Sequence, residues 1–408
     1  MIYFVVLLLL IPCIYFFDYR KNKKGDKVAY LIFYLFAVCI AGLRYRIGGD
    51  SIGYEISYER MPTLLSIWNF NFDSIRYEPG FIIFSSIPRT FSSDFTLFQF
   101  FHAFVINAVM FWFIARNTQN KYIGILLYFI CNYLNLNTEV LRETLAVCMF
   151  LLAWPFFRDG KWLWYYLITG LACFFHVSAI VTLILPLFMI PGIHEVFKLG
   201  KRTIIICLLV FGVCMFLQKR FFSIVEMLAH GSTIEERAQV YVKNSYGGIV
   251  LNLFGMTETL LRVIIFPLAA LYYRRLQLKG ADVKSKIYRE FKGFETLVIT
   301  GVYFAVGSLV IFILIRYNNY FSTFNYVLIA SCFFTKFERK KRRFKIPAVA
   351  WSLLLVIYIG LNFKGYFGST YGSESNKRYM LYYPYVSRLD PHEDYNREEV
   401  LRYSKHIK

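Results

Sequence analysis

The segment RYRIGGD at residues 44–50 combines residue types that bind an anion. The guanidinium groups of Arg44 and Arg46 are rigid forks that match phosphate oxygens. The two glycines let backbone N–H groups approach an anion closely. Asp50 can balance the arginines or act as a base, and Tyr54 follows four residues later. The alternative is that both arginines only reach water from a helix end that an ordinary turn follows.

Further charged side chains stand where apolar runs begin. Glu78 opens the segment YEPGF at 77–81, where it can serve the chemistry or simply complement a helix dipole. Glu139, Arg142 and Glu143 have the spacing i, i+3 and i+4, so a helix beginning at 139 would place them on one face. Charges at membrane depth are costly and usually functional. The alternative is a self-neutralising pair that holds the helix end.

Three more candidates lie further along the chain. His176 stands between two apolar runs, where an imidazole can act as a general base, donate to phosphate or simply pack at a helix end. Arg262 lies inside a predicted apolar helix, and Arg316 opens the turn RYNNYF at 316–321. With the arginines named above, these residues would supply five guanidinium groups for one anionic ligand.

The composition indicates what positions these residues. Apolar residues make up 57% of the 408 residues and charged residues only 18%, whereas a soluble domain carries roughly a quarter. The apolar runs do not alternate, so they predict helices in lipid and not barrel strands. We therefore expect an all-α polytopic membrane protein with about 12 transmembrane helices. These are predicted near residues 2–17, 28–43, 96–115, 121–135, 139–157, 162–175, 177–191, 203–218, 257–273, 295–315, 318–335 and 346–361.

Basic residues predict the orientation of these helices. The loop at 20–27 carries five Lys and Arg residues and should be cytoplasmic. Alternation then places the loops 274–292 and 336–345, the two most basic short loops, on the same side. A full span at 78–92 would reverse them, so this Pro-containing segment is expected to be re-entrant or interfacial. Both termini and every candidate side chain are then expected to face outward. The outer face would hold the segments 44–95, 136–143, 219–256 and 362–408.

The predicted organisation is a transmembrane domain over 1–361 and an outward-facing tail over 362–408. The net charge of +20 often indicates nucleic-acid binding. Here the basic residues lie mostly in short loops and no such motif is visible, so topology and attraction to anionic headgroups explain them better. The eight Cys form no CxxC and lie almost all in apolar runs, which predicts neither a metal site nor disulfides. The first apolar run reads as a transmembrane helix and not as a cleaved signal.

At these motifs the chain resembles the EpsG-like branch of the Wzy-type polymerases of bacterial capsule, exopolysaccharide and O-antigen. Glu143 departs from the family pattern, in which Gln is common at that position, and this puts its role in doubt. The resemblance rests on six segments in family order: GLRYRIGGDSIGY (42–54), YEPGF (77–81), VLRETLA (140–146), FHVSA (175–179), IRYNNYF (315–321) and YYPYVS (382–387).

The resemblance implies a glycosyl transfer at the outer face of the bacterial inner membrane. A growing glycan on undecaprenyl pyrophosphate would move onto a hydroxyl of a second lipid-linked repeat unit. It implies no metal, cofactor or nucleotide sugar, so arginines would stabilise the pyrophosphate leaving group. Expected partners are the lipid-linked donor and acceptor, membrane lipid, a chain-length regulator and a flippase, but no nucleic acid.

The acceptor hydroxyl also needs a group that takes its proton. Asp50 and Glu143 stand beside arginines that would hold them ionised, which makes them poor bases. Glu139 is nearer the aqueous mouth, and His176 has a reference pKa closest to neutrality. The sequence favours His176 over Glu139.

Two other functions remain open from the sequence. One is another lipid-linked glycan transferase or ligase. The other is a transporter or flippase of an anionic lipid-linked sugar, in which charges would continue through the midplane of the membrane. In this chain the candidate charges stay near the outer ends of the predicted helices, and no pseudo-symmetric halves are visible.

Overall fold

The structure is a computed structural model that describes residues 2–229, 257, 260–278, 286–333, 348–370 and 373–407. The chain forms two compact units, which are treated separately below. The first unit comprises Met1–Ile184 with the C-terminal segments Gly365–Thr370 and Ser375–Tyr403, and the second covers Leu185–Lys364.

The described residues include two helices that are long and apolar enough to cross a membrane, Ile2–Tyr19 and Phe95–Asn117. The bent pair Val177–Met189 and Pro191–Phe197 adds a third if it counts as one span. Trp162–Phe175 and Leu353–Phe367 are shorter apolar helices. The protein is thus a helical membrane protein, and the prediction of an all-α fold is confirmed. The count of 12 spans stays a prediction.

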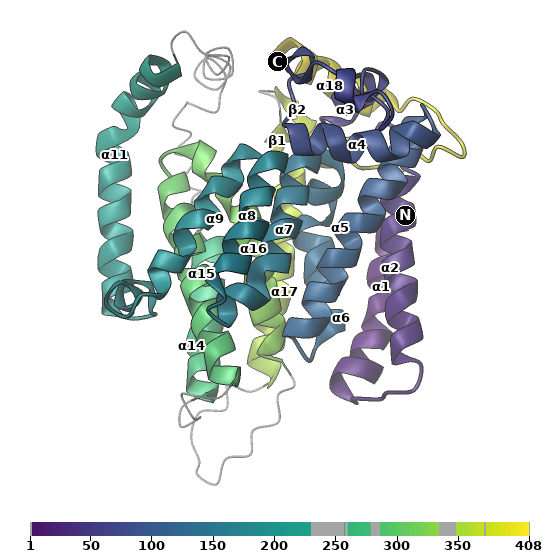
Figure 1. Cartoon of the computed structure of the whole chain (residues 1–408). Coiled ribbons are helices and arrows are strands. Elements are labelled where there is room, and N and C mark those ends of the chain that lie inside the picture. The colour runs from purple at the N-terminus through teal and green to yellow at the C-terminus, as the bar shows by residue number, and fades with distance from the viewer. Residues whose placement is uncertain are drawn as a thin grey trace. The chain divides into compact units, whose positions relative to one another are not determined.

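The first unit has upright helices and a helix, α4, that lies across them (Figure 1). Figure 1 shows α1, α2 and α5 standing upright while α4 lies across their upper ends. This crosswise position fits an interfacial helix better than a full span at 78–92. The helices are α1 (Ile2–Cys13, continued by a π-helix at Ile14–Tyr19), α2 (Asp26–Gly42), α3 (Ser51–Glu59), α4 (Pro79–Phe91), α5 (Phe95–Asn117), α6 (Lys121–Tyr128), α7 (Leu141–Arg158), α8 (Trp162–Phe175), α9 (Ile180–Ile184) and α18 (Tyr395–Ile407).

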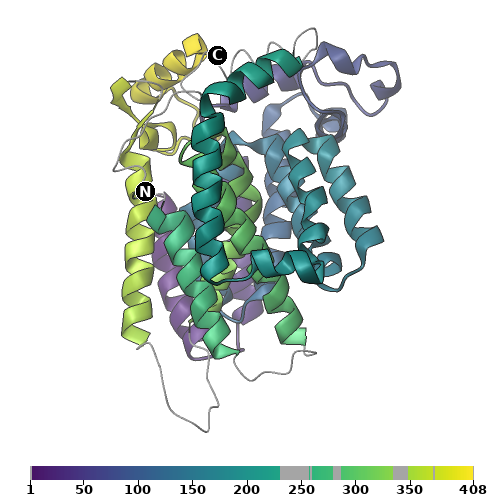
Figure 2. The ribbon, with the colours of Figure 1, turned by 90° about the vertical axis from the view of Figure 1, so that its left-hand side faces the viewer.

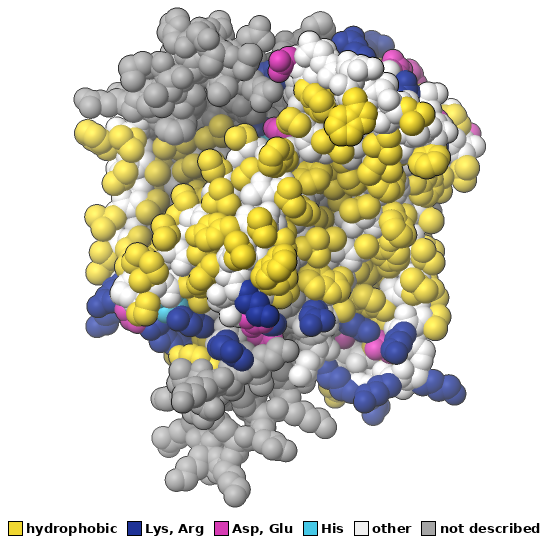
Figure 3. Space-filling view, viewed as in Figure 1, with side chains coloured by type: hydrophobic (Ala, Val, Ile, Leu, Met, Phe, Trp, Pro, Cys, Tyr) yellow, Lys and Arg dark blue, Asp and Glu magenta, His cyan; other side chains and the backbone are white. Residues whose placement is uncertain are grey.

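One end of the first unit, here called the basic end, gathers three helix connections. Lys21, between α1 and α2, donates to Oδ1 of Asn120 at 2.8 Å, and Lys121 pairs with Asp26 at 2.8 Å. Trp154, near the end of α7, donates to the last residue of α5 at 2.9 Å. Figure 3 shows hydrophobic side chains over the faces of α1, α2 and α5, with Lys and Arg side chains below them. This is the charge pattern expected of a cytoplasmic end.

The second unit contains most of the remaining helices. In both views α14, α15 and α17 stay upright (Figures 1 and 2). Its helices are α10 (Pro191–His194), α11 (Lys201–Ala229), a π-helix at Leu260–Ile265, α14 (Phe266–Gln277), α15 (Lys286–Ser308), α16 (Asn318–Ser331) and α17 (Ala348–Lys364). Two short strands follow in the chain, β1 (Ser369–Thr370) and β2 (Ser373–Lys377), and they lie mostly in the C-terminal segments of the first unit. The core of the second unit joins the π-helix to the second half of α15 through Ile264, Val302, Ala305 and Val306, with Cys207, Val210 and Phe211 packed against them.

Two of the predicted helix boundaries that were wrong lie beside the candidate residues Glu139 and His176. α7 begins at Leu141 and not at 139, because two π-helical turns precede it and Val140 leaves the helical region at φ −105°, ψ 51°. Glu139 therefore does not share a helix face with Arg142. The apolar run predicted at 177–191 is broken into short helices. The chain turns back at His176, so that Tyr165 of α8 donates to the carbonyl oxygen of Thr182 at 2.5 Å.

Candidate active site

At the end of the first unit opposite the basic end, here called the site end, Arg142 organises one group of side chains. Its Nη1 atom lies 2.5 Å from Oε2 of Glu78, and its guanidinium stacks 4.7 Å from the ring centroid of Tyr77. The Tyr54 hydroxyl is also a hydrogen-bond partner of Arg142. Its Nε is buried and has no hydrogen-bond partner among the described residues. We call these four residues the arginine cluster.

The start of α4 positions Glu78 for this contact. Glu78 is the residue before the helix, and Pro79 occupies the first helical position, where its missing N–H costs nothing. A Cβ atom at Gly80 would lie 2.7 Å from the carbonyl oxygen of Phe174, at the end of α8. Only glycine therefore lets the start of α4 approach α8 this closely. The motif YEPGF is thus a local device that brings a carboxylate to Arg142.

A second group forms around Glu139. Its Oε1 accepts hydrogen bonds from the backbone N–H of Gly49 and from the Tyr382 hydroxyl, both at 2.8 Å. Burial and the nearby negative charge of Asp50 raise the pKa of Glu139 above its ordinary value, against a smaller lowering by Arg378. Arg378 is exposed and is hydrogen-bonded to Tyr382. Gly49, Asp50, Glu139, Arg378 and Tyr382 are called the glutamate cluster.

The glycine turn holds Gly49 against Glu139. Gly48 has φ +100°, and a Cβ atom there would lie 2.8 Å from Cβ of Thr138, so glycine is required both for the backbone and for the space. The N–H of Gly48 donates to the carbonyl oxygen of Leu381 at 3.1 Å. One turn therefore contacts both the segment that carries Glu139 and the one that carries Tyr382.

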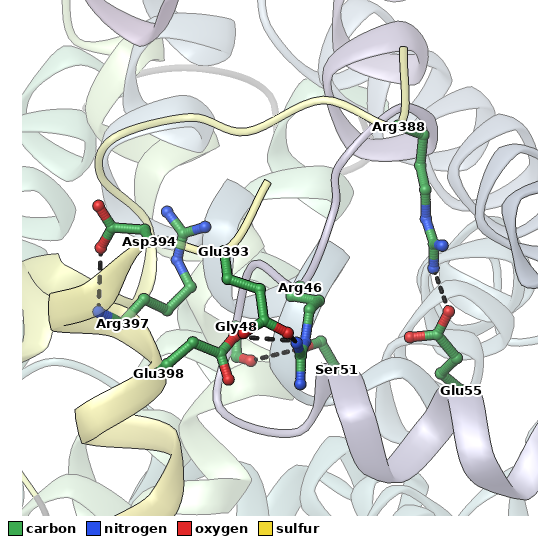
Figure 4. A network of polar contacts seen from close by, with 9 residues as sticks. All are labelled: Arg46, Gly48, Ser51, Glu55, Arg388, Glu393, Asp394, Arg397 and Glu398. Carbon is green, nitrogen blue, oxygen red and sulfur yellow. Dashed lines mark hydrogen bonds and ion pairs between the residues drawn. The ribbon is translucent and has the colours of Figure 1, made fainter. Parts of the chain in front are cut away.

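The C-terminal segment folds over the site end and is fixed there by ion pairs. Arg46 pairs with Glu393 and, at 3.3 Å, with Glu398, while Arg388 pairs with Glu55 (Figure 4). The backbone N–H groups of Tyr45 and Arg388 donate to the carbonyl oxygens of Val386 and Leu43 at 2.9 and 2.7 Å. The tail predicted at 362–408 is therefore built into this end of the unit over Ser375–Tyr403.

Arg44 is more deeply buried than Arg46 and Arg142. Only 2% of it is exposed, and its Nη1 donates to the carbonyl oxygen of Ala41 at the end of α2. Burial lowers the pKa of Arg44 to about 10, against the opposing influence of tyrosines that include Tyr133 and Tyr385. Arg44 therefore remains charged near neutrality, but it supports the turn from below and does not line an open surface.

His176 caps the short helix that follows it. Its Nδ1 accepts from the backbone N–H of Ser178 at 3.2 Å and lies 2.6 Å from the Ser178 hydroxyl. This contact occupies Nδ1. The Gly80–Phe174 contact places the end of α8, and with it His176, on the same side of the unit as the arginine cluster.

The other predicted site residues lie apart from the two clusters or belong to the second unit. Glu143 is buried, with 2% exposed, and the ion pair of Arg142 is formed with Glu78. Arg262 lies in the π-helix of the second unit, 3.4 Å from Oδ1 of Asn362. Arg316 lies in a 3-10 helix at Phe312–Tyr317 of the same unit. Among the described residues, no three His, Cys, Asp or Glu side chains form a group suited to a metal ion.

The sequence analysis did not single out Tyr77, Tyr382 or Arg378 as site residues. Tyr77 and Tyr382 each begin a motif that carried the resemblance, and this was the available signal. Arg378 lies just before the second of these motifs and had no signal of its own. Its role depends on the path of the C-terminal segment.

The fold and the site define a class of protein. It is a helical membrane protein with carboxylates and arginines gathered at one end of its first unit. The chain matches the EpsG family over residues 27–387 and belongs to that family, as the motifs predicted. It is thus a membrane protein of the polysaccharide-polymerase type, and such proteins are glycosyltransferase-like enzymes. No curated protein and no solved structure matches the chain.

Proposed function

We propose that the protein polymerises a lipid-linked glycan at the outer face of the bacterial inner membrane. A growing glycan on undecaprenyl pyrophosphate is transferred to a hydroxyl of a second lipid-linked repeat unit. The observation that carries the proposal is the meeting of two chemically different clusters at one end of the first unit. In this proposal the chain crosses the membrane about 12 times, and both termini lie outside.

The arginine cluster binds the pyrophosphate of the donor. A half-buried guanidinium, whose Nε has no partner among the described residues, and an adjacent tyrosine hydroxyl match the oxygens of a phosphate. Glu78 holds Arg142 in place, and the aromatic face of Tyr77 fixes the plane of the guanidinium. Arg46 is a further candidate for this anion, and Arg44 supports the turn that carries Arg46.

The glutamate cluster supplies the base. The acceptor oxygen attacks the anomeric carbon of the donor sugar while the bond from that carbon to the pyrophosphate oxygen breaks. The acceptor proton passes to the carboxylate of Glu139. The pyrophosphate leaves as an anion, and the arginines stabilise its negative charge. A raised pKa suits Glu139 to this role, because a base is most effective when its pKa approaches the working pH. His176 is the competing base.

The direct test supplies purified protein with lipid-linked repeat units and separates the products by length. A ladder of lengths is expected. A single addition would favour a ligase or another transferase, and unmodified substrate that crosses the membrane of a vesicle would favour a flippase.

The orientation is tested by labelling in intact cells on a background without the native cysteines. We expect an impermeant thiol reagent to reach Cys in a Ser373→Cys variant and to miss it in a Ser285→Cys variant. The reverse pattern would place both clusters on the cytoplasmic side and overturn the proposed reaction at the outer face.

A further inference from the structure

Beside the glutamate cluster, two short C-terminal helices and the residue that follows the second one carry four aromatic rings and one exposed arginine. The helices are Gly365–Phe367 and Arg378–Leu381, joined by a hydrogen bond of 3.0 Å from the N–H of Arg378 to the carbonyl oxygen of Gly368. The rings belong to Tyr366, Phe367, Tyr379 and Tyr382, and with Arg378 they are called the aromatic platform.

The four rings form two contacting pairs, and the cation lies over one ring of the first pair. The guanidinium of Arg378 lies 5.8 Å from the ring centroid of Tyr366, whose ring meets that of Tyr382 edge-on at 5.8 Å and 86°. The rings of Phe367 and Tyr379 lie 5.7 Å apart with their planes at 45°. Phe367 is 64% exposed and Arg378 is exposed as well. The platform therefore offers aromatic surface and hydrogen-bond donors to the same ligand.

This combination fits a sugar ring. A pyranose has an apolar C–H face, which packs on an aromatic ring, and a rim of hydroxyls, which accept from a guanidinium. A membrane anchor would instead hold its charged groups away from exposed rings, toward the headgroups. In the platform, Arg378 lies against Tyr366 and is bonded to Tyr382, so ring and charge are presented together.

The position of the platform links it to the reacting atoms. Tyr382 belongs to both groups, because its hydroxyl donates to Glu139 and its ring packs against Tyr366. A glycan whose reacting hydroxyl lies at Glu139 would therefore have its next sugar residue near Tyr366 and Phe367. We propose that the aromatic platform is a sugar-binding subsite for the residue next to the reacting one. This inference rests on the proposed function, because it takes the substrate to be a glycan.

The test measures binding without chemistry. Lipid-free oligosaccharides of two repeat units, cut from the surface polysaccharide of the source cell, are titrated calorimetrically onto the full-length protein. Phe367→Ala and Tyr379→Ala should each weaken binding about tenfold, which corresponds to about 1.4 kcal/mol. The matched control is Phe91→Ala, which removes a ring that is 80% exposed at the end of α4 and should leave binding unchanged.

Equal binding by wild type and Phe367→Ala, or no binding by wild type, would overturn the subsite. A second measurement addresses the lipid alternative with a Phe367→Trp variant in nanodiscs. A change in Trp emission on addition of the oligosaccharide supports the subsite, whereas quenching by brominated lipid with no response to sugar overturns it. Wild-type protein that binds the oligosaccharide but builds no ladder would support the subsite and overturn the polymerase.

Discussion

The arginine cluster and the glutamate cluster each contain one glutamate at the same end of the first unit, in opposite electrostatic surroundings. Glu78 forms an ion pair with Arg142 at 2.5 Å. Glu139 faces two neutral donors and the negative charge of Asp50. A carboxylate that is engaged by an arginine fixes that arginine in place, while one with a raised pKa is a better proton acceptor. The difference indicates a division of labour between binding the leaving group and activating the acceptor.

The largest effect should come from removing the base. Glu139→Gln should lower turnover by about a hundredfold or more, because the acceptor proton loses its positioned acceptor. His176→Gln should retain turnover within a few-fold, since His176 Nδ1 is occupied by the Ser178 cap. Rates and pH profiles of both variants decide between them. If His176→Gln is inactive and removes a rate limb near pH 6 to 7, about the reference pKa of histidine, while Glu139→Gln stays active, the base is His176.

The next largest effect concerns the arginine cluster. Arg142→Lys keeps the charge but loses the fork, so turnover should fall about ten- to hundredfold while the protein still folds and inserts. Arg158→Lys is the matched control at the basic end, where Arg158 pairs with its neighbour Asp159 at 2.8 Å. It should keep full activity. Wild-type turnover in Arg142→Lys would give Arg142 a purely structural role.

The sequence predicts contacts between helix ends better than contacts made by the C-terminal segment. Alternating spans were enough to predict that the motifs at 44–50, 77–81 and 139–143 meet at one end, because each follows or precedes a helix end. The contact of Tyr382 with Glu139 joins residues 243 positions apart and depends on how the tail passes over the turn at Gly48. Hydrophobic periodicity contains no information about such a path, so only the motif that begins at Tyr382 hinted at it.

The same reasoning explains the misplaced helix start before Arg142. The order of apolar and polar residues over 129–139 fits the period of an ordinary α-helix. The segment nevertheless forms π-helical turns. Within them Asn137 hydrogen-bonds to Asn107 at 2.8 Å and to Tyr128 at 3.0 Å. These buried contacts, made with another helix, offset the poorer local geometry. The helix propensity of a single segment cannot predict such contacts.

A smaller effect should follow from altering the charge beside Glu139. Asp50→Asn removes the negative charge that helps raise the pKa of Glu139. Because the base must be ionised, the rate rises as pH passes through this pKa. The rising limb of the pH profile should therefore move to lower pH in Asp50→Asn and stay in place in Asp50→Glu. A limb that stays unchanged in both variants would mean that Asp50 does not act on the base.

The smallest expected effect, and the sharpest test of the comparison, is that of Tyr382→Phe. The Tyr382 hydroxyl donates to the Glu139 carboxylate and so stabilises its charged form. Its removal should raise the pKa of Glu139 further and move the rising limb to higher pH, opposite to the shift in Asp50→Asn. At pH values above the limb, turnover should fall only a few-fold, because the carboxylate and its bond to Gly49 remain.

Tyr385→Phe is the matched control for this variant, since it removes a hydroxyl from the same segment, one that donates to the carbonyl oxygen of Ile40 at 2.9 Å. It should leave the limb in place. A merely structural role for Tyr382 would lower turnover equally at every pH and move no limb. Opposite shifts in Tyr382→Phe and Asp50→Asn would assign the titrating base to Glu139, because a donor that favours its charge and a charge that opposes it both act on that one carboxylate.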